Sequence, residues 1–443
     1  MMELLPLLPD SGMDTIVAYR GATPVRRSDF LADVHAIAAS IPQTDHVLNL
    51  CRDRYWFAAA LFACISRGKL GILPNSAAPE IVSELIRELP DLVCLGDQPS
   101  IAHPLPYLQV STLEARQEVP FVPLIPADRA IVHVYTSGST GKPKAHVKTF
   151  GRICSCAKTE AARMWAVTKN PCAVLGTVPF QHMYGLESTI FLPLLGGGML
   201  SSPLPFFPAD VADSLEALPE PRLLVTTPFH LGKLVESGIE FPEISAIVSA
   251  TAPLSGELAR EAEQRLGAPI LEIYGSTETG QIATRRPTGS PRWEVFDGVS
   301  LCQERGATIA SGGHLEGPQI LQDILELEDE FHFHLVGRNS DMVNVAGKRS
   351  SLAYLNRILA GIPGVRDGVF CIPDPEGERG RLAAFVVAQG LSQQDIQSSL
   401  LGKLDPVFLP RPVVFLESLP RDGNGKMRAA VLEELIARHI HAK

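Results

Sequence analysis

The stretch Tyr135-Thr-Ser-Gly-Ser-Thr-Gly-Lys-Pro-Lys144 decides the fold of this 443-residue chain. It follows the apolar run AIVHVY (130–135), which predicts a loop that leaves a strand. Two glycines let the backbone approach a bulky anion, and the hydroxyl and lysine side chains supply donors and positive charge. The composition predicts a phosphate-binding loop.

A Walker-type loop is the first alternative, and it requires the pattern G-x-x-x-x-G-K-[ST]. Here the residue five before Gly141 is Thr136 rather than glycine, and Pro143 follows Lys142. Proline cannot donate the N–H that begins the next helix, and the hydroxyl residue that would hold magnesium is absent at that position. These two departures exclude a P-loop kinase or ATPase.

The rest of the chain predicts an α/β protein. Apolar strand-like runs, beginning with VLNLC (47–51), alternate with helix-like segments such as 54–67 and 81–89. The same alternation continues, with further strand-like runs in AVLGTVPF, LLVTTP, ISAIVSA and PILEIYG. It indicates βαβ units and a large N-terminal domain, residues 1–337, with mostly parallel sheets flanked by helices. Ligands of such sheets bind at the carboxyl ends of the strands.

A change of pattern near residue 337 predicts a second domain. A helix over 352–359, strands in GVFCIPD and LAAFVVAQ, a helix near 395–403 and a strand in VVFLESLP indicate a small α+β unit. We expect the domain boundary at 338–341 and a small C-terminal domain at 342–443.

Charge and cysteine content narrow the class of protein. Acidic residues outnumber basic ones, 49 to 39, and this argues against nonspecific nucleic-acid binding. The longest apolar stretch, around 190–200, is interrupted by Pro193 and three glycines, so no membrane span is expected. The 8 cysteines lack zinc spacing, and the N-terminus lacks the features of a secretory signal. We expect reduced thiols in a cytoplasmic protein.

The loop at 135–144 resembles the phosphate loop of the adenylate-forming superfamily, which contains acyl-CoA synthetases, nonribosomal-peptide adenylation domains and firefly luciferase. The resemblance implies that the β- and γ-phosphates of ATP are wrapped by Thr136, Ser137, Gly138, Ser139, Thr140 and Gly141, with Lys144 beside them.

Three further segments resemble the same superfamily, in the same order. Pro179-Phe-Gln-His-Met-Tyr-Gly-Leu-Glu187 resembles a segment that lines the acyl pocket, which implies that role for His182 and Tyr184. Ser249-Ala-Thr-Ala-Pro-Leu254 resembles a turn between the acyl group and adenine. This places Ser249, Ala250 and Thr251 at the acyl group and Ala252 and Pro253 at AMP.

The third segment, Tyr274-Gly-Ser-Thr-Glu278, resembles the magnesium motif. The resemblance implies that Tyr274 stacks on adenine, that Thr277 touches the α-phosphate and that Glu278 holds Mg²⁺. An aromatic face suits a purine, and a hard carboxylate oxygen suits Mg²⁺. Gly275 and Ser276 complete the nucleotide contacts.

The ribose-binding residue is less regular. Asp323 stands in Leu321-Gln-Asp-Ile324, fourteen residues before Gly337, which is the spacing expected between the ribose aspartate and the hinge motif. A carboxylate matches the two donors of a diol. The alternative is that Asp323 is one of many acids in QDILELEDE.

The hinge and tail carry the last implied residues. Arg338 would bind ribose or phosphate, Ser340 would be the pivot, and Gly347 would belong to the loop that shapes the thiol tunnel. Lys426 follows the turn Asp-Gly-Asn-Gly, and the resemblance gives it the catalytic role of bridging the substrate carboxylate and the α-phosphate. His182, Thr277 and Glu278 are the other expected catalytic residues.

The resemblance implies an ATP- and Mg²⁺-dependent ligase that forms an acyl-adenylate and transfers the acyl group to CoA or an acyl carrier protein. The acid is an aryl acid, as in ligases of aryl-polyene and xanthomonadin-type pigment clusters, or a medium-chain acid. A stand-alone amino-acid adenylation domain and a non-catalytic nucleotide-binding protein are alternatives. The oligomeric state is left open between monomer and homodimer. Two departures stand out: only 134 residues precede the loop, and the stretch 281–319 is short and irregular.

Overall fold

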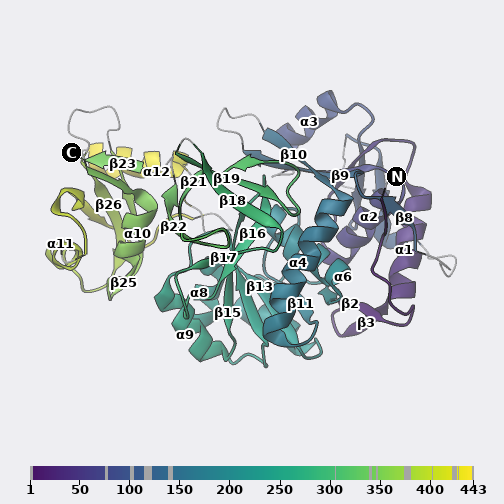
Figure 1. Cartoon of the computed structure of the whole chain (residues 1–443), viewed down its shortest axis with the longest axis horizontal. Coiled ribbons are helices and arrows are strands. Elements are labelled where there is room, and N and C mark those ends of the chain that lie inside the picture. The colour runs from purple at the N-terminus through teal and green to yellow at the C-terminus, as the bar shows by residue number, and fades with distance from the viewer. Residues whose placement is uncertain are drawn as a thin grey trace.

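The computed structural model describes residues 3–74, 78–99, 104–113, 122–137, 143–304, 306–338, 342–345, 348–373, 381–401, 403–421, 427 and 429–441. Figure 1 shows a large body formed by the N-terminal three quarters of the chain, with the C-terminal elements gathered at one end. The α/β class expected from the sequence is confirmed.

The first large sheet has six strands in the order β10-β9-β5-β4-β6-β7. Their bounds are β4 (His46–Asn49), β5 (Leu70–Leu73), β6 (Val93–Gly96), β7 (Tyr107–Gln109), β9 (Ala130–Ser137) and β10 (Pro143–Thr149). The strands from β9 to β7 pair in parallel, whereas β10 turns back against β9. A short pair, β1 (Leu4–Pro6) and β8 (Leu124–Pro126), lies apart from this sheet.

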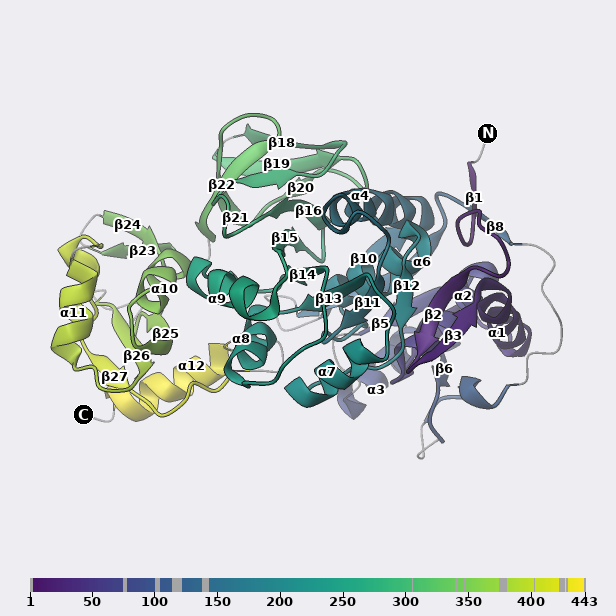
Figure 2. The ribbon, with the colours of Figure 1, turned by 90° about the horizontal axis from the view of Figure 1, so that it is seen from below.

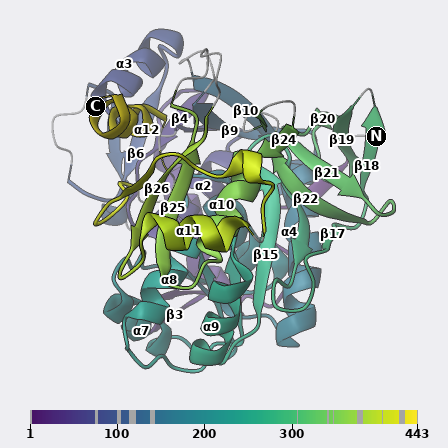
Figure 3. The same cartoon turned by 90° about the vertical axis from the view of Figure 1, so that its left-hand side faces the viewer.

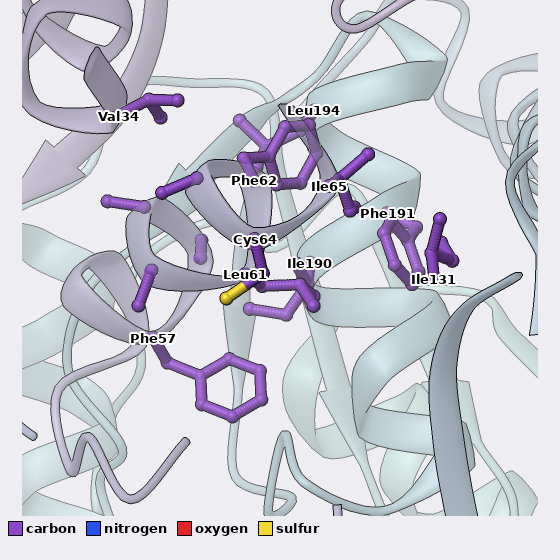
Figure 4. Close-up of a cluster of buried hydrophobic side chains, with 14 of the residues drawn as sticks. Val34, Phe57, Leu61, Phe62, Cys64, Ile65, Ile131, Ile190, Phe191 and Leu194 are labelled. Carbon is purple, nitrogen blue, oxygen red and sulfur yellow. The ribbon is translucent and has the colours of Figure 1, made fainter. Parts of the chain in front are cut away.

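The helices of this region are α1 (Arg27–Ser40), α2 (Arg54–Ser66) and α3 (Pro79–Glu88). Helix α2 begins where the Asp53 side chain accepts a hydrogen bond from the Trp56 N–H. Its apolar side chains are buried on every side, as a central helix requires. Figure 4 shows them packed against Phe191 and neighbouring residues; the ring centroids of Phe62 and Phe191 lie 6.2 Å apart.

The second large sheet has eleven strands in the order β21-β22-β17-β16-β15-β14-β13-β11-β12-β2-β3. Their bounds are β2 (Ile16–Arg20), β3 (Thr23–Arg26), β11 (Ala173–Gly176), β12 (Met199–Ser201), β13 (Arg222–Thr226), β14 (Ala246–Ser249), β15 (Ile270–Ser276), β16 (Gly280–Arg285), β17 (Trp293–Val295), β21 (Asp323–Leu327) and β22 (His332–Arg338). The centre, from β2 to β15, is parallel, but both edges are antiparallel. The expectation of mostly parallel sheets therefore holds for the centre and fails at the edges.

Helices cover both faces of this sheet (Figure 2). They are α4 (Phe150–Thr168), α5 (Met183–Leu186), α6 (Leu192–Gly196), α7 (Pro208–Glu216), α8 (Pro228–Glu236) and α9 (Gly256–Leu266), with a π-helical turn, η2 (Glu187–Phe191), between α5 and α6. Leu224 and Ile247 pack with residues of α7, α8 and α9, whereas Val225 and Val248 pack with Met164 of α4. Alternate residues of each strand therefore supply two cores.

The stretch expected to be irregular, 281–319, is regular. Besides β16 and β17 it forms β18 (Val299–Glu304) and β19 (Ala307–Gly312), which join β20 (Gln319–Ile320) in a small antiparallel sheet. Figure 2 places this sheet above the start of α4, where the Thr149 N–H donates to the Glu316 carboxylate at 2.7 Å. The chain is short here because antiparallel hairpins need only brief connections.

The C-terminal elements have hydrophobic clusters of their own. They are β23 (Met342–Val345), β24 (Lys348–Ser351), α10 (Leu352–Ala360), β25 (Val365–Cys371), β26 (Ala383–Ala388), α11 (Gln393–Leu401), β27 (Val413–Phe415) and α12 (Ala429–Ile436). Figure 3 shows α10 and α11 in front of the body. The two clusters in this region contain only residues from 343 onward. No helix in the described part of the chain is long and apolar enough to cross a bilayer.

A buried arginine of α2 binds the ends of two parallel strands of the second sheet. Arg54 is fully buried, and its guanidinium donates to the carbonyls of Gly176 and Ser201 at 2.7 Å each and to that of Pro203. Gly176 and Ser201 end β11 and β12, so one side chain satisfies backbone groups at both strand ends.

We predict that Arg54→Met lowers the free energy of unfolding of the N-terminal region by about 3 kcal/mol, because buried carbonyls lose their donors. All three tryptophans precede residue 338, so their fluorescence during urea unfolding reports on this region. Arg67→Met, at the exposed end of the same helix, should change the midpoint little. Equal midpoints for the two variants would contradict the bracing role.

Candidate active site

The expected phosphate loop joins two antiparallel strands. Thr136 and Ser137 end β9, and Lys144 on β10 pairs with Thr136. Lys144 is exposed. Gly138, Ser139, Thr140 and Gly141 lie outside the described residues, as do the side chains of Thr136 and Ser137.

The expected magnesium motif forms the turn of a second hairpin, between β15 and β16. The Ser276 N–H donates to the Thr279 hydroxyl at 3.0 Å, and the Thr279 N–H donates to the Ser276 hydroxyl at 3.2 Å. These reciprocal bonds tighten the turn that carries Thr277 and Glu278. The Glu278 side chain is 42% exposed and therefore accessible to a ligand.

The Glu278 carboxyl is suited to a hard cation. Burial raises its pKa, but hydrogen bonds from its own backbone and from Ser276, with the charges of His146 and Lys148, outweigh burial and hold the pKa below its usual value. The group is an ionised oxygen ligand at neutral pH. No cluster of three or more His, Cys, Asp or Glu side chains in the described part of the chain could hold a metal. A single carboxylate assisted by substrate phosphates is a usual arrangement for Mg²⁺, so the residues fit that ion.

Tyr274 and Asp323 come together across the sheet. The Tyr274 hydroxyl donates to Asp323 Oδ2 at 2.8 Å, although 49 residues separate them. The Tyr274 ring packs against both Trp293 and Phe333, with centroid distances of 5.6 and 5.4 Å, and those two rings stack on each other at 6.1 Å. The structure therefore brings the expected adenine and ribose residues into one unit.

Asp323 also stands opposite Arg338 in the pairing of β21 with β22. The side chain of Arg338 is outside the described part of the chain. Ser340, Gly347 and Lys426 also lie outside the described residues, so their expected roles stay predictions.

The small-residue turn that contains Ala250, Ala252 and Pro253 follows β14, as expected. Its backbone is strained, because Thr251 has a φ of +78°, a region that β-branched residues rarely adopt. The hydroxyls of Ser249 and Thr251 are buried and have no hydrogen-bond partner among the described residues. Unpartnered buried hydroxyls are costly, so this turn is suited to a polar ligand.

The aromatic segment is only partly as expected. His182 precedes α5 and is half-buried. The Tyr184 hydroxyl donates to the carbonyls of Thr226 and Val248 at 3.0 and 3.1 Å, at the carboxyl ends of β13 and β14. That hydroxyl fastens two strands, so only the ring of Tyr184 is available to line an acyl pocket.

Sequence reasoning missed two residues of β10. His146 and Lys148 share a face with Lys144, and they become more buried along the strand. His146 Nε2 lies 3.6 Å from Glu278 Oε1, and Lys148 Nζ donates to the Glu278 carbonyl at 2.9 Å. The alternation Lys-x-His-x-Lys was the available signal, because every second side chain of a strand points the same way.

Burial lowers the pKa of His146, and the charges of Lys144 and Lys148 lower it further, against the effect of Glu278. The hydrogen bond from Lys148 to the Glu278 carbonyl connects the β9–β10 hairpin to the β15–β16 hairpin. The two hairpins that carry the expected phosphate loop and magnesium motif are therefore neighbours.

Comparisons with known proteins agree with this arrangement. Residues 26–304 match the family model described as AMP-binding enzyme. The chain is 28% identical to the 4-coumarate–CoA ligase of Rhodobacter capsulatus over 297 residues, which cover 66% of this chain and 73% of the relative. It is 26% identical to the p-hydroxybenzoic acid–AMP ligase FadD22 of Mycobacterium marinum, covering 88% of this chain but only 61% of that longer relative.

The fold is similar to that of the o-succinylbenzoate coenzyme A synthetase of Bacillus subtilis, solved with ATP and magnesium ion. The TM-score is 0.76 at 22% identity, and the match covers 91% of this chain and 94% of the other. At that identity the likeness concerns the fold alone. The family match spans all of the first large sheet, the parallel centre of the second except β2, and both hairpins of the candidate site, and so this chain belongs to the family of AMP-binding enzymes.

Proposed function

We propose that this chain is an ATP-dependent acid–thiol ligase, which converts a carboxylic acid into an acyl-adenylate and transfers the acyl group to a thiol. The observation that carries the proposal is the Lys148–Glu278 hydrogen bond, which holds the two nucleotide hairpins together. The Tyr274–Asp323 bond brings the expected adenine and ribose residues together. Tyr274 lies on β15, the strand that leads into the turn carrying Glu278.

In the proposed first step, the substrate carboxylate attacks the α-phosphorus of ATP, and pyrophosphate leaves. Mg²⁺ held by Glu278 would neutralise charge on the phosphate oxygens. Lys426 would stand between the two anions that must approach each other. At about 4 Å and an effective dielectric of ~20, a unit charge offsets ~4 kcal/mol of their repulsion.

In the second step, we propose that the C-terminal domain, residues 342–443, rotates about 338–341, with Ser340 as the pivot. Lys426 leaves the site, and the loop around Gly347 enters to form the thiol tunnel. The separate hydrophobic clusters of this region support a unit that moves as a whole.

We propose an aryl acid that carries a hydroxyl group, in preference to a medium-chain fatty acid. The unpartnered hydroxyls of Ser249 and Thr251 support this choice, because an alkyl chain would leave them without hydrogen bonds. The similarity to a p-hydroxybenzoic acid–AMP ligase supports the same class.

An amino-acid substrate is disfavoured. Glu187 is the only carboxylate in the aromatic segment that could pair with a substrate ammonium. It is buried, and its Oε1 accepts a hydrogen bond from Cys156 Sγ at 3.3 Å. The charge of Lys148 also acts on it, so the carboxylate is already engaged within the protein.

We propose CoA as the acceptor, since it is the thiol named for several relatives, with a holo-carrier protein as the alternative.

All eight cysteines are free thiols and seven are buried, which supports a cytoplasmic location. The working unit is a monomer or a homodimer, and sedimentation at assay concentration distinguishes the two.

The function is tested by hydroxamate release with ATP over hydroxybenzoates, unsubstituted benzoate, medium-chain fatty acids and amino acids. We expect hydroxybenzoates to exceed benzoate by about tenfold or more in kcat/KM, and Ser249→Ala to reduce that preference. CoA and a holo-carrier protein are then compared as acceptors with the best acid. Turnover with fatty acids alone, or with amino acids alone, would contradict the proposal.

For Lys426→Ala we predict a loss of acid-dependent ATP–pyrophosphate exchange of about a hundredfold or more, because two anions then approach without the bridging cation. Thioester formation from supplied acyl-adenylate should continue, because that step does not use the lysine. Lys403→Ala removes an exposed C-terminal lysine and should leave both rates unchanged. Exchange near the wild-type rate in Lys426→Ala would refute the role.

For Asp323→Ala we predict loss of the preference for ATP over 2′-deoxy-ATP, because the carboxylate is expected to accept from the ribose hydroxyls. Tyr274→Phe should raise the KM for ATP by about tenfold, since a hydrogen bond to a charged group is worth ~1.5–3 kcal/mol. Glu326→Ala, on the same strand and exposed, is the matched control. If Asp323→Ala still prefers ATP over 2′-deoxy-ATP as strongly as the wild type does, Asp323 is an ordinary surface acid and does not bind ribose.

A further inference from the structure

A buried polar cluster lies behind the turn that carries Glu278. Its members come from β10, α4, η2 and β16, and each is at most 5% exposed: Lys148, Cys156, Glu160, Glu187, Ser188 and Gln281. Buried polar groups lower the stability of the fold unless they are hydrogen-bonded, so a cluster of buried polar residues calls for an explanation.

Lys148 is the cation of the cluster. Its ammonium donates to the backbone carbonyl of Glu278 at 2.9 Å, from a neighbouring hairpin 130 residues away in sequence. Burial lowers the pKa of this ammonium, and among the carboxylates that counter the effect Glu187 acts most strongly. The positive charge is thus held inside the protein by Glu187 and by the turn itself.

Glu187 approaches the same turn from its other side. Burial raises the pKa of its carboxyl to about 7, whereas the charge of Lys148 and the backbone of Gln281 favour the ionised form. A Cβ on Gly280 would lie 2.5 Å from Glu187 Oε1, and Gly280 has a φ of +69°. Only glycine combines that backbone conformation with so close an approach. Glu187 begins the π-helical turn η2, a distortion that often marks functional positions.

Glu160 differs from these two residues. Its Oε1 accepts from the Ser188 hydroxyl at 2.6 Å, and Gln281 Nε2 donates to the same hydroxyl at 2.8 Å. Burial raises the pKa of Glu160 to about 8, so its carboxyl is mostly protonated at pH 7. It fills the cluster without bonding the backbone of the turn.

We propose that Lys148 and Glu187 are positioning residues that clamp the β15–β16 turn from both sides, Lys148 at Glu278 and Glu187 at Gly280–Gln281, and thereby fix the Glu278 carboxylate for the magnesium–nucleotide complex. The inference rests on the proposed function and adds two residues to it. Opposite charges suit the task, because a cation binds a carbonyl and a carboxylate binds an N–H.

The test compares two ligands by titration calorimetry: AMP in EDTA, and a non-hydrolysable ATP analogue with Mg²⁺. Lys148→Met should weaken binding of the magnesium–analogue complex by about tenfold or more and change AMP binding by less than about twofold. Lys148→Arg, which keeps the charge and a donor, should restore part of the affinity. Glu160→Gln, matched in burial but without a bond to the turn, should bind both ligands as the wild type does.

The double variant Lys148→Met/Glu187→Gln guards against misfolding, because it replaces both charges and leaves neither buried alone. We expect it to fold, to bind AMP normally and to require more Mg²⁺ for half-maximal pyrophosphate exchange. Wild-type affinity of this variant for the magnesium–analogue complex would overturn the clamp and leave the proposed function standing. Failure of the unaltered protein to bind either nucleotide would overturn both.

Discussion

The hydrogen bond from Lys148 to the Glu278 carbonyl joins the two large sheets where the nucleotide is expected to bind. β10 belongs to the six-stranded sheet, and the β15–β16 turn belongs to the eleven-stranded one. Sheets that pack only through apolar side chains can slide, because dispersion and hydrophobic contacts have little directionality. A charged donor on a fixed carbonyl has a direction, so it sets the distance between β10 and the turn that carries Glu278.

The adenosine side of the candidate site is held in a different way. Tyr274 packs against both rings of the stacked pair Trp293 and Phe333, and the Arg285 guanidinium lies 4.6 Å from the centre of the Trp293 ring. Aromatic packing fixes the position of the Tyr274 ring, and its hydroxyl then orients the Asp323 carboxylate. Apolar packing and one polar bond together make a rigid platform, which lowers the entropy lost when a nucleoside binds.

Much of the fold could be predicted from the sequence, because parallel strands buried on both faces leave short apolar runs such as VLNLC and ISAIVSA. The edges were harder to predict. In the 281–319 stretch, strands such as β18 have only a few buried residues, which alternate with exposed ones, and they pair with strands close in sequence. Their sequences therefore resemble those of loops. In the site, motifs located Tyr274 and Glu278. The partnership of Lys148 with Glu187 depends on three-dimensional packing, and no short motif contains both residues.

Thr251 has a further consequence, which concerns the evolution of selectivity. A glycine at this position would relieve backbone strain of about 1–2 kcal/mol, since φ is positive there. The same change would remove a buried, unpartnered hydroxyl that we expect to lie at the acyl group. Stability and substrate choice therefore favour different residues at one position of the turn. Variants of this enzyme selected only for heat resistance would drift towards a less discriminating pocket.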